Sequence, residues 1–151
     1  MSNKYSIVTG ASRGLGAAIA EELAREGYDV VITYCTQADK AQKVKKQLET
    51  KFGVRVESYQ LDIKDEEAVL AFRKWVEETL GTNLQVLVNN AGSAYYGLHE
   101  ELNPKKIQEM VRTDLEVPMI LSQQLLRGFK KNKGCIVNIA SVTAQQSNPH
   151  G

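Results

Sequence analysis

The sequence predicts an α/β fold built on a doubly wound parallel sheet. Apolar runs with strand character alternate with helical patterns almost without interruption along the 151 residues. Five such units follow one another, and no hairpin signal interrupts them. A glycine-rich turn at residues 9–16 stands between the first apolar run and the first helical pattern. We therefore expect the strand order 3-2-1-4-5, right-handed crossovers and helices on both faces of the sheet.

The N-terminal half contains three expected strands. The first covers residues 5–9 and leads into a helix over 15–27. A β-branched run at 30–34 is apolar enough for the middle of a parallel sheet. A helix over 38–52 follows, and glycine is the residue that commonly ends a helix at the next position. Alternation over 54–60 indicates the third strand.

The second half continues the alternation. Asp65 can cap a third helix. Residues 84–88 form the fourth expected strand, and Pro104 opens a long helix that runs to about residue 127. A last apolar run at 135–140 is the fifth strand. The third helix has one apolar face, made of Ala68, Val69, Phe72, Trp75 and Val76.

Composition fits one domain, residues 1–151, because 42% hydrophobic content supplies a core. A net charge of +1 with mixed acids and bases predicts no nucleic-acid partner. No apolar stretch approaches the ~18 residues of a membrane span, and no signal peptide is visible. Cys35 and Cys135 form no metal or redox motif, so we expect free thiols in a cytoplasmic protein. His99 and His150 read as surface residues, and we assign no metal.

Residues with special chemistry or conformation stand at the carboxyl end of every expected strand. In an open parallel sheet these ends meet at one edge, and ligands bind there at the switch point of the strand order. Scattered polar residues have no reason to align in this way in every strand. The sequence therefore predicts a binding site at this edge, formed by Gly10, Tyr34, Asp62, Asn90 and Ser141.

The glycine-rich turn has the properties of an anion site. Glycines at 10, 14 and 16 let the backbone turn tightly and approach a pyrophosphate. The following helix offers unpaired N–H groups and the positive end of its dipole. Glycine patterns also recur in plain turns between a strand and a helix. The strand before and the helix after this turn are what favour nucleotide binding.

The end of the second strand bears on which dinucleotide binds. Many NAD-binding proteins place an acidic residue there to hold the ribose 2′-hydroxyl. Here the positions hold Tyr34, Cys35 and Thr36, none of them acidic. Arg13, inside the glycine turn, can instead reach a 2′-phosphate through charge-assisted hydrogen bonds. We therefore expect NADP(H) in preference to NAD(H).

Two motifs resemble the short-chain dehydrogenase/reductase family, in particular its 3-oxoacyl-carrier-protein-reductase-like members. They are Thr-Gly-x-x-x-Gly-x-Gly at residues 9–16 and Asn-Asn-Ala-Gly at 89–92, after an apolar run. The likeness extends from residue 5 to the end of the chain. It implies a Rossmann fold and hydride transfer between a nicotinamide and a carbonyl or secondary alcohol. An epimerase of the extended branch is an alternative, but its glycine loop more often reads Gly-x-x-Gly-x-x-Gly.

The resemblance also implies a set of cofactor contacts. A basic residue just before the second glycine, here Arg13, usually accompanies NADP(H) in the family. Asp62 and the backbone of Ile63 match residues near the adenine, and Thr113 matches a helix residue beside the cofactor. The turn at 90–92 matches one beside the ribose. Together with the glycine turn and the end of the second strand, the full set of expected cofactor contacts is Gly10, Ser12, Arg13, Gly14, Leu15, Gly16, Tyr34, Cys35, Thr36, Asp62, Ile63, Asn90, Ala91, Gly92 and Thr113.

Two residues resemble catalytic positions of the family. Ser141 matches the serine that binds the substrate oxygen, and Asp114 stands where the family has an asparagine. The backbone carbonyl of that asparagine holds a water in a proton relay. Pro118 has no N–H, so the carbonyl of Asp114 loses its helical partner and can accept from water. An ordinary proline kink explains the same pattern equally well. The loop at 93–103 either borders the substrate or is plain surface.

The family's Tyr-x-x-x-Lys pair finds no match in these 151 residues. We therefore expect the natural protein to continue past Gly151 and the 151-residue chain alone to be inactive. The fifth strand would then be an uncovered edge, which parallel sheets rarely tolerate. A nucleotide-binding fragment without catalysis is the alternative. The resemblance implies a small carbonyl or alcohol substrate and a homodimer or homotetramer.

Overall fold

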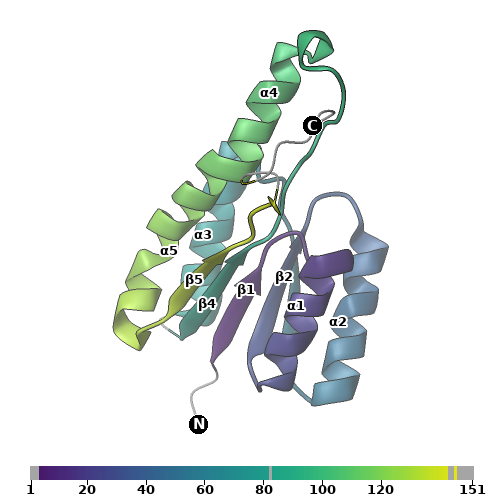
Figure 1. The fold of residues 1–151 in the computed structure, drawn as a ribbon. Coiled ribbons are helices and arrows are strands. Elements are labelled where there is room, and N and C mark those ends of the chain that lie inside the picture. Colours follow the sequence, from purple (N-terminus) through teal and green to yellow (C-terminus); the bar gives the residue numbers. More distant parts are fainter. Residues whose placement is uncertain (1–3, 82, 143–144, 146–151) are drawn as a thin grey trace.

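The computed structural model of the chain describes residues 4–81, 83–142 and 145. It confirms the doubly wound α/β fold and the expected strand order, with all strands parallel in the order β3-β2-β1-β4-β5 (Figure 1). The bounds of the strands are β1 (Tyr5–Val8), β2 (Asp29–Tyr34), β3 (Val56–Gln60), β4 (Leu84–Asn89) and β5 (Cys135–Asn138).

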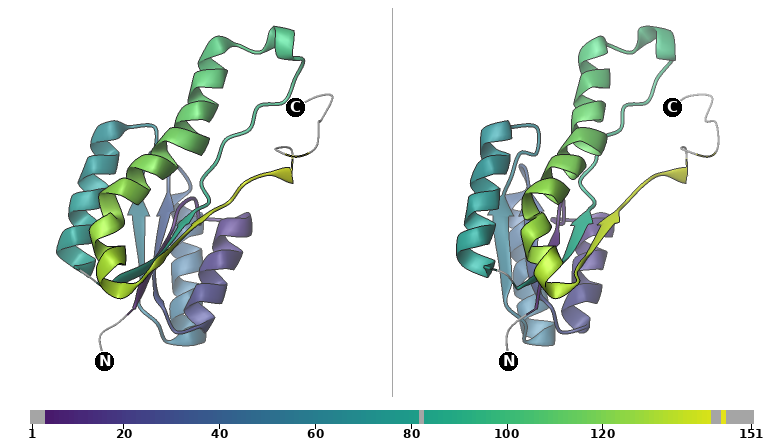
Figure 2. Two further views of the ribbon diagram at one scale, coloured as in Figure 1. Left: turned by 60° about the vertical axis from the view of Figure 1, so that its left-hand side comes forward. Right: turned by 90° about the vertical axis from the view of Figure 1, so that its left-hand side faces the viewer.

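Helices cover both faces of the sheet (Figure 2). α1 (Gly14–Arg25) and α2 (Ala38–Phe52) lie on one face, and α3 (Glu66–Leu80) and α5 (Val117–Asn132) lie on the other. α4 (Pro104–Val111) continues the line of α5 beyond the carboxyl ends of the strands, beside the loop that follows β4 (Figure 1). The carboxyl edge of the sheet is therefore flanked by α4 and by the start of α1.

The core has two halves because neighbouring residues of a strand point to opposite faces. Ile7 of β1 and Leu87 of β4 belong to the half beneath α3 and α5, together with Phe72. Val8 of β1 belongs to the half beneath α1 and α2, where Ala20 brings α1 close to the sheet. All five of these side chains are completely buried. Burial on both faces explains why the central strands are continuously apolar rather than alternating.

The expected helix signals act at their positions. Asp65 caps α3, and its carboxylate accepts from the N–H groups of Glu67 at 2.9 Å and Ala68 at 3.3 Å. Gly53 ends α2 in the left-handed conformation, with φ of 68°. Pro104 is the first residue of α4, where its missing N–H leaves no intrahelical bond unmade.

Several expected bounds are wrong by one or two residues. The helix expected over 15–27 occupies Gly14–Arg25. The third strand begins at residue 56 rather than 54, and the fifth ends at 138 rather than 140. Both are edge strands with one neighbour each, so their pairing ends with that neighbour: β3 starts opposite Val30 and β5 ends opposite Asn89. The apolar pattern of a strand does not show where its partner strand begins or ends.

The long helix expected from residue 104 to about 127 is interrupted and continues further. Arg112–Glu116 form a π-helical turn between α4 and α5, and α5 extends to Asn132. The Val117 N–H donates to the Arg112 carbonyl, five residues back. Pro118 has no N–H with which to restore the four-residue spacing, and this favours the wider turn. The helix is therefore wider at Asp114 than an ordinary α-helical turn.

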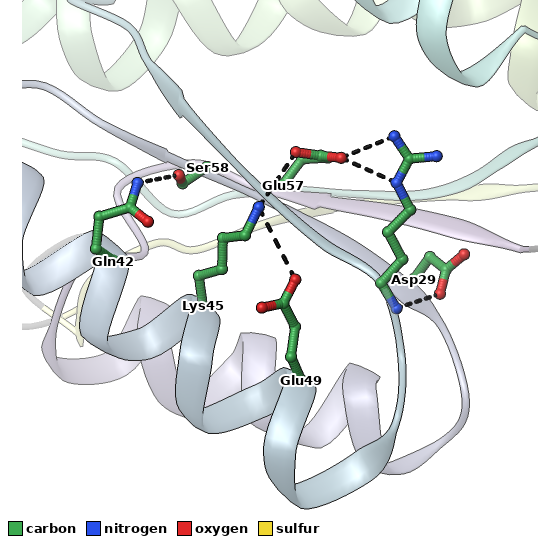
Figure 3. Close-up of polar contacts among 7 residues, drawn as sticks. Asp29, Gln42, Lys45, Glu49, Glu57 and Ser58 are labelled. Atoms are coloured by element: carbon green, nitrogen blue, oxygen red, sulfur yellow. Dashed lines mark hydrogen bonds and ion pairs between the residues drawn. The ribbon is translucent and has the colours of Figure 1, made fainter.

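A polar network fastens the edge strand β3 to α2 (Figure 3). Lys45 Nζ lies 3.4 Å from Glu57 Oε2 and 3.8 Å from Glu49 Oε1. Arg55 Nη2 lies 2.8 Å from Glu57 Oε1, so each oxygen of Glu57 has its own cation. Partial burial raises the pKa of Glu57, but the hydrogen bond from Arg55 and the charge of Lys45 outweigh it. The net effect holds this pKa below its ordinary value of 4.5.

This shift predicts a pH-dependent contribution to stability. A lowered pKa means that the Glu57 carboxylate stabilises the fold above pH 4.5, and that this contribution is lost as the pH falls through the lower folded value. We expect Glu57→Gln to reduce the free energy of unfolding by about 1 kcal/mol at pH 7 and by less near pH 3. Urea unfolding followed by Trp75 fluorescence measures it, since that ring lies 5.0 Å from the Tyr59 ring on β3.

Glu78→Gln is the matched control. Glu78 pairs with Lys74 at 3.9 Å on the exposed side of α3, where both side chains are mostly solvated. We expect this variant to change stability little at either pH. An equal loss in both variants, or a loss in Glu57→Gln that is as large near pH 3 as at pH 7, would contradict the role given to the network.

Candidate functional site

The turn after β1 uses glycine where a side chain would not fit. Gly10 and Gly14 have φ of 65° and 57°, in the left-handed region. A Cβ on Gly16 would lie 2.5 Å from Asn90 Nδ2 and 2.6 Å from the Gly10 carbonyl oxygen. The first turn of α1 therefore lies directly against the glycine turn. Its unpaired N–H groups and positive dipole end make this edge suited to an anion.

Hydrogen bonds tie the turns of neighbouring strands together. The Thr9 hydroxyl accepts from the N–H groups of Asn90 at 3.0 Å and Ala91 at 2.9 Å. Asn90 Nδ2 donates to the carbonyl oxygens of Thr9 at 2.9 Å and Gly10 at 3.3 Å. On the other side, the Gly10 N–H donates to the Thr33 hydroxyl at 3.3 Å. Sequence reasoning noted Thr9 only as the first residue of the glycine motif and missed Thr33; both side chains are buried.

These turns enclose a cleft of about 620 Å³ at the carboxyl edge of the sheet. It is formed by the glycine turn, the end of β2, the loop after β3, the turn after β4 and one side of α4 and the π-helical turn. Every residue for which the resemblance implies a cofactor contact lines it. They are Gly10, Ser12, Arg13, Gly14, Leu15, Gly16, Tyr34, Cys35, Thr36, Asp62, Ile63, Asn90, Ala91, Gly92 and Thr113.

The charges along this cleft are distributed unevenly. Arg13 lines it at the glycine turn, and no acidic residue stands at the end of β2. Asp62 lines the part of the cleft that follows β3, where its Oδ1 accepts from the Lys64 N–H at 3.0 Å. Partial burial raises the pKa of the Cys35 thiol, and the nearby Asp62 carboxylate raises it further. The Cys35 thiol is therefore protonated at neutral pH.

One wall of the cleft combines the loop at 93–103, which sequence analysis singled out, with Glu109, which it missed. Tyr95, in the loop after β4, and Glu109, on α4, both line it. The Tyr95 hydroxyl donates to Glu109 Oε2 at 2.6 Å and accepts from Lys106 Nζ at 3.2 Å. A signal for Glu109 existed, because it precedes Thr113 by four residues and shares its side of the helix. The loop at 93–103 thus borders the cleft through Tyr95.

The predicted catalytic residues lie in a different hollow. Ser141 and Asp114 line an adjoining groove of about 780 Å³, on the other side of the turn at 90–93. Asp114 Oδ1 accepts from the Ser93 N–H at 2.8 Å, and Ser141 is exposed just after β5. The two hollows share the turn at 90–93, so one backbone segment separates the predicted cofactor residues from the predicted catalytic residues.

The remaining expectations can be compared with the described residues. Cys35 and Cys135 are exposed free thiols, as expected. His150 and the side chain of His99 lie outside what the structure describes. In the described part of the chain, no helix is long and apolar enough to cross a membrane. β5 pairs with β4 alone, and its residues are largely exposed, with 42% of Val137 accessible.

Comparison with known sequences places these motifs in a family. The family model described as short chain dehydrogenase matches residues 4–151. The 3-oxoacyl-[acyl-carrier-protein] reductase of Pseudomonas aeruginosa is 38% identical over 149 residues, which cover 98% of this chain and 59% of that protein. An uncharacterized oxidoreductase of Bacillus subtilis, YmfI, is 31% identical over 141 residues, covering 93% of the chain and 57% of the relative. The chain thus spans less than two thirds of these relatives.

Solved structures share the fold. An alcohol dehydrogenase from the archaeon Thermococcus sibiricus, complexed with 5-hydroxy-NADP, superposes with a TM-score of 0.90 at 33% identity, covering 98% of this chain and 62% of that one. L-sorbose reductase from Gluconobacter frateurii, complexed with NADPH and L-sorbose, gives a TM-score of 0.92 at 32% identity, covering 99% and 56%. The family model matches nearly the whole length of the chain, and these enzymes share its fold. The chain therefore belongs to the short-chain dehydrogenase family.

Proposed function

We propose that this chain is the nucleotide-binding part of an NADP(H)-dependent oxidoreductase acting on a carbonyl or secondary alcohol. The observation that carries the proposal is the cleft of about 620 Å³ bordered by the glycine turn. A Cβ at Gly16 would overlap the turns after β1 and β4 where they meet. Gly10 and Gly14 have backbone conformations that favour glycine. This is the geometry that a pyrophosphate at a helix N-terminus requires.

The choice of NADP(H) over NAD(H) is argued from charge. A 2′-phosphate adds negative charge at the end of β2, where an aspartate or glutamate would repel it. Tyr34, Cys35 and Thr36 are uncharged there, and Arg13 lines the same cleft. A guanidinium binds phosphate through charge-assisted hydrogen bonds. The NADP-type ligands named with the two solved relatives support the same choice.

When bound, the nicotinamide supplies the hydride, and the protein supplies orientation and a proton. We assign to Ser141 a hydrogen bond to the substrate oxygen, which stabilises the charge that develops on that oxygen. The family's acid, a tyrosine with a lysine four residues later, has no match in these 151 residues. The complete reaction is therefore proposed for a protein that includes that segment. The oxidoreductase names of the relatives favour this over a module that only binds nucleotide.

Asp114 is proposed to act through two contacts, one made by its side chain and one by its backbone carbonyl. Its side chain holds the Ser93 N–H, and its backbone carbonyl lies in the π-helical turn four residues before Pro118. Proline donates no hydrogen bond, so this carbonyl can accept from water, whatever the side chain is. An asparagine at 114 would keep both features, because its amide oxygen can accept from Ser93 as well.

A small carbonyl or alcohol is the substrate class that fits, and we propose a cytoplasmic homodimer or homotetramer. The exposed apolar side chains along α4, the π-helical turn and α5 favour burial against a second copy. They follow one another at four-residue spacing and are Ile107, Val111, Leu115 and Met119. Ile120 and Leu121 instead pack in or against the core of the same chain.

Binding of the two dinucleotides tests the cofactor proposal. We expect the protein to bind NADPH more tightly than NADH in a calorimetric titration. Arg13→Ala should weaken NADPH binding by about tenfold or more, because a hydrogen bond to a charged group is lost, and should leave NADH binding nearly unchanged.

Arg73→Ala is the control for loss of a guanidinium. Arg73 pairs with Glu77 on α3, outside the cleft, so NADPH affinity should not change. Circular dichroism confirms that each variant is folded. A folded wild type that binds neither dinucleotide would overturn the proposed function. Equal weakening of both dinucleotides by Arg13→Ala would overturn only the 2′-phosphate assignment.

Activity variants test the second hollow. In a protein active on 3-oxo thioesters or small ketones, Ser141→Ala should lower kcat by about 10²–10³-fold, the loss typical for one donor to a developing oxyanion. The Kd of NADPH should not change. Asp114→Asn should remain within a few-fold of wild type, whereas Asp114→Ala should lose more because Ser93 loses its acceptor. Loss of nicotinamide absorbance measures the rates, and an unchanged kcat in Ser141→Ala would refute its assignment.

A further inference from the structure

Glu109 lines the cleft with a carboxylate that two neighbouring side chains hold. It lies on α4, one turn before Thr113, and both residues line the cleft. Its side chain is only 35% exposed. Neither the glycine turn nor the chemistry proposed for Ser141 uses this residue. A carboxylate is unexpected in a cleft suited to an anion, because its negative charge repels the phosphates of a nucleotide.

The contacts of Glu109 fix its orientation and leave one oxygen available. The Tyr95 hydroxyl donates to Oε2 at 2.6 Å, and Lys106 Nζ lies 3.5 Å from the same atom. Lys106 also lies 4.3 Å from the centre of the Tyr95 ring, so the three side chains form one cluster. Among the described residues, no hydrogen bond or ion pair reaches Oε1. The hydrogen bond from Tyr95, with the charge of Lys106, holds the pKa of Glu109 below its ordinary value, so Oε1 is an ionised acceptor at neutral pH.

The loop after β3 lines the same cleft close to Glu109. Asp62, Ile63 and Lys64 line the cleft there, and Lys64 and Glu109 also border a common groove at its rim. The positive charge of Lys64 contributes to the lowered pKa of Glu109, which agrees with this proximity. The phosphates belong at the start of α1 and the ribose at the end of β2. The base of the same nucleotide then extends past β2, towards β3 and the wall that carries Glu109.

We propose that Glu109 is a specificity-determining residue for the base of the dinucleotide, with Oε1 accepting a hydrogen bond from the exocyclic amine of adenine. Adenine carries an amine donor at this position, whereas hypoxanthine and guanine carry a carbonyl oxygen that a carboxylate repels. Tyr95 is the positioning residue, because its hydroxyl holds Oε2 and so directs Oε1. Lys106 supports both. The proposal rests on the proposed binding of NADP(H) in this cleft.

Base preference is the measurement that tests it. NADPH and its reduced hypoxanthine analogue, which differs only in the base, are titrated into the protein by calorimetry. We expect wild type to prefer NADPH. Glu109→Gln should reduce the ratio of the two Kd values by about tenfold, since the Gln amide accepts from an amine or donates to a carbonyl equally well. Tyr95→Phe should reduce the ratio by a smaller factor, because the acceptor remains but is no longer held.

Glu78→Gln is the matched control, a carboxylate paired with a lysine on α3 and outside the cleft, and it should leave the ratio unchanged. A general disturbance of the cleft would weaken both ligands equally and would not move the ratio. An unchanged ratio in a folded Glu109→Gln protein that binds NADPH would overturn the proposal. Where that variant does not fold, an unchanged ratio in Tyr95→Phe does the same. Failure of wild type to bind either ligand overturns the proposed function as well.

Discussion

The close approach of Gly16 to Asn90 is the contact on which the binding edge depends. A side chain at Gly16 would overlap the Asn90 amide and the Gly10 carbonyl, at 2.5 and 2.6 Å from its Cβ. Only because that space is free can Asn90 donate to the carbonyl oxygens of Thr9 and Gly10. The turns after β1 and β4 are thereby fixed against each other. Every other part of the cleft is arranged around this junction.

The turn at 90–93, which this junction fixes, borders two hollows. One side of it faces the cleft of the glycine turn, and the other faces the groove of Asp114 and Ser141. Asp114 holds this turn through Ser93, from a π-helical turn that Pro118 makes favourable. The long helix is therefore tied by a hydrogen bond to the turn that borders both hollows.

The fold and the position of the cleft could be predicted because they depend on local patterns. Apolar runs, helix caps such as Asp65 and the glycine spacing are visible within a few residues. Thr33 and Glu109 were missed, and the contacts of Thr9 and Tyr95 were not foreseen, because these contacts join segments that are distant in sequence or lie on different elements. The π-helical turn was missed for a related reason. Pro118 indicates that the helix is irregular, but several backbone conformations can accommodate a proline. The roles of the cleft residues in binding remain predictions.

The long sequence separation between the two turns sets the order in which the cleft can form. Thr9 and Asn90 are 81 residues apart, and the β1–β4 pairing closes the same loop. Such distant contacts are slow to form, because the chain loses loop entropy before they stabilise it. The glycine turn is complete in the sequence by residue 16, yet it gains its far wall only after β4 and α4 have docked. During synthesis the nascent chain must therefore extend well past the glycine turn before the cleft can be complete.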